Sequence, residues 1–242
     1  MLVIDERTIR RHGPGNALAV LWRQWRAERA LARRGIHFRT TSPDEIAAAY
    51  AAMSPQEFAA INGRQDWANW RTIPRCLAGQ VPDRPLAVLD LGCGAGSSTR
   101  VLAFYCPAGS HILGYELAAS LVDIARRGSY RHQSGVETRV DFICQGVTEA
   151  LRQLDGQPLP DRGVDLVNAS GVVGHHLSPE TMPSLVRELT RLLTPGGVAT
   201  LDVGPTLGLV ELTRILTAAG FSYLGHWKSW FGDPTGQAVF RL

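Results

Sequence analysis

The most constraining feature of this 242-residue chain is an apolar run that leads directly into a glycine-rich loop. The run is Leu86–Leu91, and Gly92, Gly94 and Gly96 then occupy alternate positions before Ser97-Ser98-Thr99. Glycine is needed in such a loop because the backbone turns sharply and a ligand lies against it with no Cβ in between. The segment therefore predicts a buried strand, a ligand-binding loop and the start of a helix.

The spacing of the glycines indicates which ligand the loop suits. They form G-x-G-x-G, whereas the dinucleotide fingerprint G-x-G-x-x-G would require glycine at Ser97. Asp90 adds a carboxylate at the end of the strand, where it would repel a pyrophosphate but could bind an amino group. The pattern favours an amino-acid-bearing ligand over NAD.

Downstream of Leu86, short apolar runs alternate with amphipathic stretches, which is typical of repeated βα units and a parallel sheet. The expected strands are Leu86–Leu91, His111–Glu116, Arg139–Cys144, Val164–Ala169, Val198–Val203, Phe221–Trp227 and Gln237–Leu242. The last two flank the turn-rich range 231–236 and should form an antiparallel hairpin. The clearest helix is expected to begin at Ser178-Pro179-Glu180 and to end at Pro195-Gly196-Gly197.

The first 75 residues differ from the rest because they contain helix signals and no predicted strand. The range 17–34 is amphipathic and precedes Gly35, a C-cap glycine. Ser42 and Ser54, each followed by proline, provide two further helix starts. We therefore expect residues 1–75 to form a helical cap and residues 76–242 to form the sheet domain.

Charge and hydropathy restrict the classes of partner. Residues 1–39 hold nine arginines against three acids, so the N-terminal segment is basic and the remainder slightly acidic. Lys228 is the only lysine, which favours a solvated arginine-rich helix face over a surface for a polyanion or a membrane. No apolar run reaches the ~18–20 residues that span a bilayer, and Asp5 and Glu6 replace the basic start of a signal peptide. A cytoplasmic location is expected.

The cysteines do not indicate a metal site or a disulfide framework. Cys76, Cys93, Cys106 and Cys144 form no CxxC pair and are spread through predicted core segments. Reduced and mostly buried thiols are expected, and no metal is predicted.

Polar residues follow two further strands at the edge where the glycine loop lies. Glu116 ends the second strand about twenty residues after the loop, a position that can grip a ribose diol. The third strand ends in Cys144-Gln145-Gly146-Val147, where an amide side chain and a backbone N–H could read an adenine edge. These residues predict a ligand crevice at the carboxyl edge of the sheet.

The ordered set of the glycine loop, Glu116, Val164–Val167 and Leu192–Gly197 resembles the class I S-adenosylmethionine-dependent methyltransferases, over roughly residues 80–242. The resemblance implies a Rossmann-like seven-stranded α/β sheet of order 3-2-1-4-5-7-6, with the last strand antiparallel and helices on both faces. It implies S-adenosyl-L-methionine as cofactor, bound by Asp90, Gly92, Cys93, Gly94, Gly96, Glu116, Leu117, Gln145, Gly146, Val147, Ala169 and Ser170. Gln145 departs from the aspartate that usually stands at its position.

Two histidines follow the fourth strand, beside the expected position of the methyl group. The stretch Gly174–Glu180 resembles that of plant and bacterial phenol O-methyltransferases, which implies His175 as the general base and places Asp202 close to a supporting acid. Leu177 stands where that family usually has tryptophan, and its long dimerisation domain is absent. Three roles stay open for the pair: proton transfer, contact with substrate or cofactor, and packing.

Tyr50, His176 and Trp230 are the predicted substrate-binding residues, and the aromatic side chains suggest an aromatic or apolar substrate. The leading expectation for the function is methyl transfer from the cofactor to an oxygen or nitrogen atom of a small molecule. The alternative is an RNA or protein methyltransferase that docks through its arginine-rich N-terminal segment. Nucleic acid is disfavoured because Asn168-Ala169-Ser170-Gly171 lacks the Asn-Pro-Pro-Tyr-like motif of enzymes that methylate exocyclic base nitrogens. An adenosyl-binding protein without transferase activity and a nicotinamide oxidoreductase are more distant alternatives, and the oligomeric state is left open.

Overall fold

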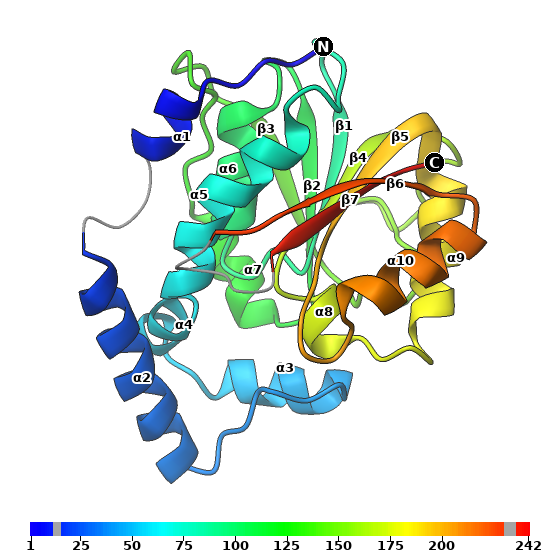
Figure 1. Ribbon diagram of the computed structural model, residues 1–242. Helices are drawn as coiled ribbons and strands as arrows, with labels where there is room; N and C mark the ends of the chain where they lie inside the picture. The colour runs from blue at the N-terminus through cyan, green and yellow to red at the C-terminus, as the bar shows by residue number, and fades with distance from the viewer. Residues whose placement is uncertain (12–15, 230–235) are drawn as a thin grey trace.

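The protein is described by a computed structural model that covers residues 1–11, 16–229 and 236–242. Its centre is a seven-stranded sheet of order β3-β2-β1-β4-β5-β7-β6 (Figure 1). The strands are β1 Ala87–Leu91, β2 His111–Glu116, β3 Arg139–Cys144, β4 Val164–Ala169, β5 Leu193–Asp202, β6 Ser222–Trp227 and β7 Gln237–Arg241. β7 runs antiparallel to both β5 and β6, and the other neighbours pair in parallel. The predicted fold and strand order are confirmed.

Helices cover both faces of the sheet because successive strand residues point to opposite sides. On one face, Val88 and Leu166 pack with α5 Gly63–Leu77, α6 Ser97–Tyr105 and α7 Ala119–Arg126. On the other, Leu89 and Leu91 pack with α9 Met182–Leu192 and α10 Leu209–Ala218. A short helix, α8 Val173–His176, follows β4 at the edge of the sheet.

Two predicted boundaries are wrong in the region between β4 and β5. Helix α9 begins at Met182 and not at Ser178, because the Thr181 hydroxyl accepts from Ser178 N at 3.0 Å and donates to its carbonyl, closing a separate turn. Strand β5 begins at Leu193 and includes Pro195-Gly196-Gly197, with an irregularity in its pairing between Val164 and Leu166.

Five helices precede β1: α1 Glu6–Arg11, α2 Ala17–Arg33, α3 Pro43–Ala51, α4 Pro55–Ile61 and α5. The serine start signals form as expected, since Ser42 caps α3 and Ser54 forms a capping box with Glu57 at α4. Helices α2, α3 and α4, which we call the cap helices, lie at one end of the sheet (Figure 1).

Helix α5 runs across residue 75, the expected boundary between the cap and the sheet domain, and ends at Leu77. Its residues Ile73 and Leu77 are fully buried in the same cluster as Leu2 and the sheet residues of that face. The backbone of Leu2 also donates to the Val81 carbonyl at 3.1 Å. The first residues of the chain and α5 therefore share the core of the sheet, whereas the cap helices build a separate small cluster around Leu31.

Candidate functional site

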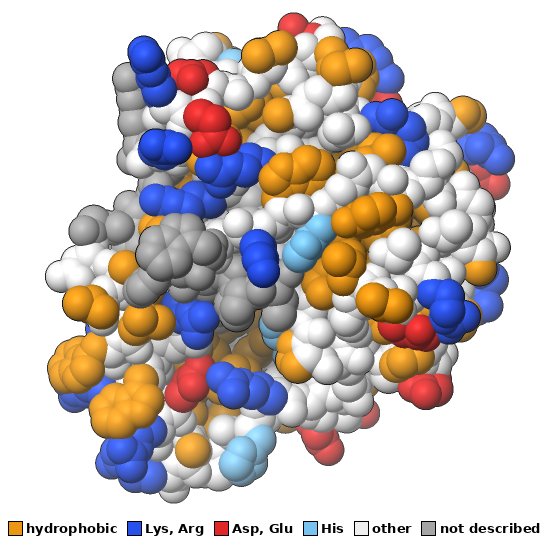
Figure 2. Space-filling model, viewed as in Figure 1, with side chains coloured by type: hydrophobic (Ala, Val, Ile, Leu, Met, Phe, Trp, Pro, Cys, Tyr) orange, Lys and Arg blue, Asp and Glu red, His pale blue; other side chains and the backbone are white. Residues whose placement is uncertain are grey.

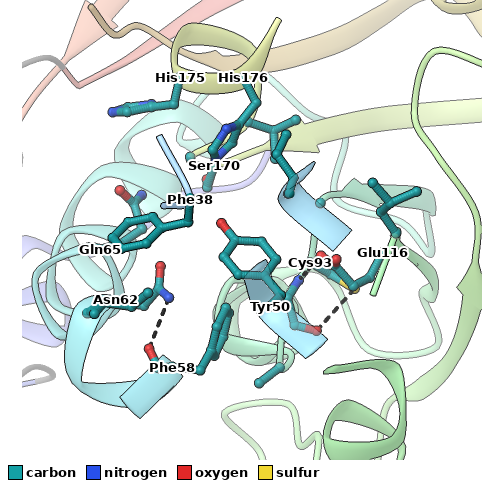
Figure 3. A pocket seen from close by; sticks show the side chains of 18 of the residues that line it. Phe38, Tyr50, Phe58, Asn62, Gln65, Cys93, Glu116, Ser170, His175 and His176 are labelled. Carbon is teal, nitrogen blue, oxygen red and sulfur yellow. Dashed lines mark hydrogen bonds between the residues drawn. The ribbon is translucent and has the colours of Figure 1, made fainter. Parts of the chain in front are cut away.

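A cavity of about 1060 Å³ lies between the carboxyl end of the sheet and the cap helices (Figure 3). Its floor comes from the glycine loop after β1 and from residues that follow β2, β3 and β4, which parallel pairing brings to the same edge. Its walls come from α8 and from the cap helices with the start of α5. The sheet therefore supplies one half of the cavity and the N-terminal helices supply the other.

All three glycines of the loop adopt positive φ angles, 65° at Gly92, 54° at Gly94 and 86° at Gly96. Gly92 and Gly94 line the cavity with Cys93 between them. A Cβ on Gly92 would collide with Val172, and one on Gly94 would lie 3.0 Å from the Phe58 ring. Gly96 does not line the cavity.

The reason for glycine at position 96 is internal packing. A Cβ there would collide with the Tyr130 hydroxyl, and Gly96 is the N-cap of α6 in a left-handed conformation. The structure thus separates the loop into two ligand-facing glycines and one that lets the following helix approach its neighbours.

Asp90 does not face the cavity, contrary to the sequence-based expectation. Its side chain is fully buried, where Ser98 and Thr99 donate to Oδ2 at 2.7 and 2.6 Å and Asn168 donates to Oδ1 at 2.7 Å. Burial raises the pKa of this carboxyl, and the three hydrogen bonds oppose that rise. Asp90 therefore ties the strand to α6 and β4 beneath the loop.

Glu116 ends β2 and lines the cavity as predicted, although only 5% of it is exposed. Its Oε2 accepts from Gly94 N at 3.0 Å (Figure 3), and its Oε1 accepts from Ala118 N at 2.8 Å. Burial raises the pKa of the carboxyl, and these backbone N–H groups favour its charged form. Each oxygen keeps a second lone pair, so the pair can still accept hydrogen bonds from a diol.

Of the predicted cofactor-binding residues that follow β3, two line the cavity and one does not. Gly146 and Val147 line the cavity, as does Leu117 after β2. Gln145 points elsewhere, because its Nε2 donates to the Ala150 carbonyl at 2.8 Å and its Oε1 accepts from Arg152 N at 3.2 Å. The predicted role of Gln145 at a ligand is thus not matched by its placement, and the amide braces its own loop.

Of the two predicted cofactor-binding residues at the end of β4, only one lines the cavity. Ala169 is fully buried in the core of the sheet and does not line the cavity, whereas Ser170 does. Ser170 accepts from Gln237 Nε2 at 3.1 Å, which links this wall of the cavity to β7.

His175 and Asp202 form a hydrogen-bonded pair at the cavity wall, with Nδ1 and Oδ2 2.9 Å apart. The carboxylate also accepts from the backbone N–H groups of Val172, Val173 and Gly174, each at 2.9 Å. Burial raises the pKa of Asp202, but the hydrogen bond and charge of His175 and the backbone donors outweigh it, so the pKa is lowered overall. An ionised Asp202 requires a proton on His175 Nδ1, which leaves Nε2 as the basic nitrogen.

A close approach of two backbones holds this pair in place. A Cβ on Gly204 would collide with the Gly174 carbonyl and would lie 2.9 Å from His175 Nδ1. Thr206 adds a hydrogen bond from its hydroxyl to the His175 carbonyl at 3.0 Å. The segment after β5 therefore supports both the imidazole and its carboxylate.

His176 and Tyr50, two of the predicted substrate-binding residues, also line the cavity. His176 Nδ1 lies 2.9 Å from the Thr40 carbonyl, which joins α8 to the segment before α3, and burial lowers the pKa of this histidine. Tyr50 stacks edge-on against Phe58 with ring centroids 5.4 Å apart (Figure 3). Burial and the charge of Glu116 raise the pKa of the Tyr50 phenol. Trp230, the third predicted residue, lies outside the described residues.

Several cavity residues were not predicted from the sequence. They are contributed by the cap helices, by the segment between α2 and α3, and by the first turns of α5, and they include Phe38, Phe58, Asn62, Arg64 and Gln65. The serine-proline start signals fix the rotation of α4 and could have indicated that Phe58 is buried, but not what it faces. No group of metal-ligating side chains occurs among the residues that the structure describes, and their four cysteines are free.

Comparison with known proteins agrees with the geometry of the site. Residues 88–197 match the family model described as a methyltransferase domain. A trans-aconitate 2-methyltransferase of Methylobacterium radiotolerans is 28% identical over 170 residues, which cover 68% of this chain and 55% of the relative. A probable tRNA methyltransferase 9B of Bos taurus is 29% identical over 53% of this chain and 23% of its own length.

Among solved structures, the magnesium protoporphyrin IX methyltransferase of Synechocystis with bound S-adenosylmethionine superposes with a TM-score of 0.51. It is 19% identical, and the match covers 77% of this chain and 81% of that one. The chain spans about half or less of the length of the first curated relatives that it matches. Residues 88–197 thus resemble a methyltransferase domain, and the strand order of the sheet is that of the class I S-adenosylmethionine-dependent methyltransferases.

The residues of the cavity fit the cofactor of that class, S-adenosylmethionine. Gly92 and Gly94 line the cavity where a Cβ would meet Val172 or the Phe58 ring, and Glu116 offers buried carboxylate oxygens for ribose hydroxyls. Leu117 and Val147 give apolar contacts on that side of the cavity. The helices before β1 lie outside the match to the family model, which begins at residue 88.

Proposed function

We propose that this protein transfers the methyl group of S-adenosylmethionine to an oxygen or nitrogen atom of a small aromatic or apolar molecule. The observation that carries the proposal is the His175–Asp202 pair on the wall of the cavity that also holds Glu116 and the glycine loop. A buried, ionised carboxylate that orients an imidazole is an arrangement suited to general-base catalysis.

The lining of the cavity supports an apolar substrate. Phe38, Tyr50 and Phe58 come from three separate parts of the N-terminal region and converge above the floor (Figure 3). Polar side chains line the cavity as well, and Asn62 and Gln65 lie beside the aromatic rings (Figure 3). Aromatic walls with polar groups between them are typical of small-molecule sites, where the polar groups fix orientation.

The chain's part in the reaction is to position the acceptor and to take its proton. When bound, the cofactor supplies a sulfonium methyl group, and the acceptor's lone pair forms the new bond to that carbon as the carbon–sulfur bond breaks onto sulfur. His175 Nε2 receives the proton that an attacking hydroxyl or amine loses, and Asp202 stabilises the imidazolium that results. The aromatic walls exclude water, and proximity supplies most of the remaining acceleration.

The test is turnover of a panel of phenols, amines and carboxylic acids with methyl-labelled cofactor. With an accepted phenol, His175→Ala should lower kcat by roughly 10²–10⁴-fold and leave cofactor affinity nearly unchanged. His176→Ala is the matched control, because His176 is held by Thr40 and not by a carboxylate. If both variants lose cofactor affinity together and neither changes the pH profile of kcat, the histidines are packing residues and the proposal of a base is wrong.

A macromolecular acceptor is the second candidate, favoured by the name of the tRNA methyltransferase relative and by exposed arginines on α2. In that case binding to generic RNA should weaken steeply with salt, as phosphate contacts do. Methylation of small molecules without any salt-dependent RNA binding favours the first candidate.

A further inference from the structure

The outer side of α2 exposes an apolar row that nothing in the described structure covers. Leu18, Trp22 and Trp25 are 73%, 56% and 52% exposed and recur at intervals of four and three residues. This spacing places them on one side of the helix, opposite the side on which Val20 and Leu31 are buried. Exposed tryptophans in a row indicate a surface that is used for binding.

Arginines border this apolar row and give the surface around it a positive charge. The guanidinium of Arg26 lies 4.6 Å from the ring centre of Trp22, and that of Arg29 lies 4.8 Å from the ring centre of Trp25. Arg23 and Arg33 are exposed on the same helix. Hydrophobic and basic side chains accordingly lie next to one another over α2 (Figure 2).

No acidic side chain balances these arginines on the outer side of the helix. Glu28 is the only acid within α2, and it turns inward, where it accepts from Gln24 at 2.8 Å and from Arg39 at 3.0 Å and lines the cavity. The outer surface of α2 is therefore both apolar and uniformly cationic, so its partner must be apolar and anionic.

Two other partners fit this surface less well. A second copy of the chain would bring two arginine-bordered rows together without an acid between them, which like-charge repulsion opposes. Nucleic acid would use the indoles as stacking platforms, but a guanidinium already covers one face of each ring, and Leu18 offers nothing to a base or a phosphate. An aliphatic side chain in line with two tryptophans is suited to the acyl boundary of a bilayer.

We infer that α2 docks the protein on the surface of an anionic phospholipid bilayer. The helix lies along the interface over its length of about 25 Å. Leu18, Trp22 and Trp25 enter the boundary between headgroups and acyl chains, and Arg26 and Arg29 contact lipid phosphates and carboxylates. This docking is peripheral, and it leaves the inner side of α2 in the wall of the cavity.

The test is flotation of the full chain with vesicles of phosphatidylcholine, alone or mixed with phosphatidylserine. We expect binding to the mixed vesicles and little binding to phosphatidylcholine alone. Trp22→Ser with Trp25→Ser should weaken binding at least tenfold, as an order-of-magnitude loss of apolar insertion. Arg26→Gln with Arg29→Gln should weaken it by about fivefold for each arginine.

Two matched double variants control for loss of exposed apolar area and of charge elsewhere. Val210→Ser with Tyr223→Ser removes exposed apolar side chains outside α2, and Arg187→Gln with Arg214→Gln removes surface cations. Both should bind vesicles like the unmodified protein. Thermal melting should be alike for all variants, since every substituted side chain is exposed.

Insertion is measured separately with lipids brominated on their acyl chains, which should quench tryptophan fluorescence in the unmodified protein and much less in the double tryptophan variant. The inference is overturned if the unmodified protein binds no better to vesicles with phosphatidylserine than to phosphatidylcholine alone. It is also overturned if the α2 variants bind vesicles as well as the control variants do. It is equally overturned if the tryptophan variant retains vesicle binding but loses binding to RNA, which would make α2 a nucleic-acid surface.

Discussion

Replacing Asp202 with asparagine should destabilise the protein strongly, because one carboxylate holds four donors. Each is 2.9 Å away: the backbone N–H groups of Val172, Val173 and Gly174 and the imidazole of His175. An asparagine keeps one acceptor oxygen and presents an NH₂ group in place of the other. Val172 N–H and Val173 N–H lose their acceptor if the amide oxygen takes the place of Oδ2. Gly174 N–H loses its acceptor if the oxygen takes the place of Oδ1, since the NH₂ group can then donate to Nδ1 of the other His175 tautomer. His175 also loses its partner in that case if its Nδ1 keeps the proton.

The magnitude follows from this count. A buried hydrogen bond to a charged group contributes roughly 1.5–3 kcal/mol, so the loss of one or two predicts a fall in the free energy of unfolding of about 1.5–6 kcal/mol. For a chain of this size, each kcal/mol shifts the melting temperature by about 2–4 °C. Asp202→Asn should therefore lower Tm by at least about 3 °C in thermal melts followed by circular dichroism.

The effect should also depend on pH in a defined direction. Because the folded-state pKa of Asp202 is depressed, its stabilisation is present above the unfolded-state pKa and is lost as pH falls below about 4. The difference in Tm between the two proteins should shrink as pH falls below about 4.

Asp123→Asn is the control, since that carboxylate is exposed and lies 3.8 Å from Arg126 in a surface pair. It should change Tm by no more than about 2 °C. A melting temperature for Asp202→Asn that matches this control would refute the four-bond arrangement. It would also remove the physical basis for assigning the basic nitrogen of His175.

The remaining predictions concern the cofactor and the cap. Calorimetric titration should detect S-adenosylmethionine and its demethylated product but not NAD, and Glu116→Gln should weaken S-adenosylmethionine binding by about 10–100-fold through loss of a charge-assisted acceptor. Unchanged affinity in Glu116→Gln would mean that the ribose lies elsewhere. A chain that begins at Arg75 should show no cooperative melting, because it lacks Leu2 and Ile73 from the core of the sheet, and a sharp transition in it would contradict the shared core.

Strand positions could be predicted from the sequence because they depend on short-range signals, whereas the strand order was implied by the resemblance to the methyltransferase family. Leu86–Leu91 is mostly apolar and has a glycine turn at its end, as expected of a buried parallel strand. The same holds for β2, β3 and β4, whose predicted bounds agree with the structure. Proline and glycine at positions 195–197 were less informative, since an irregular strand can include residues that usually end a helix.

The walls of the cavity could not be predicted, because they depend on where distant helices pack. Phe58 lies next to Gly94 in the structure, although the two residues are 36 positions apart in the sequence. Nothing in the local sequence of α4 states which loop its aromatic side chain will cover. Gly204 was missed for a similar reason, as only the three-dimensional approach to Gly174 shows why a side chain is excluded there.

The three acids at the ends of β1, β2 and β5 show how placement decides between a scaffold and a site. Asp90, Glu116 and Asp202 look equivalent in the sequence, since each ends a buried strand, and all three are buried and hydrogen-bonded. Asp90 accepts hydrogen bonds only from side chains beneath the loop and does not line the cavity. Glu116 holds the backbone of the glycine loop and still lines the cavity, so a change at this position acts on loop and ligand together.

Asp202 does the same for the other half of the site, because it holds the backbone of α8 and the imidazole that α8 presents. The glycine loop and α8 are thus each anchored by a carboxylate from a neighbouring strand. In the proposed reaction, preorganisation of this kind lowers the reorganisation needed when charge moves from the acceptor to the imidazole.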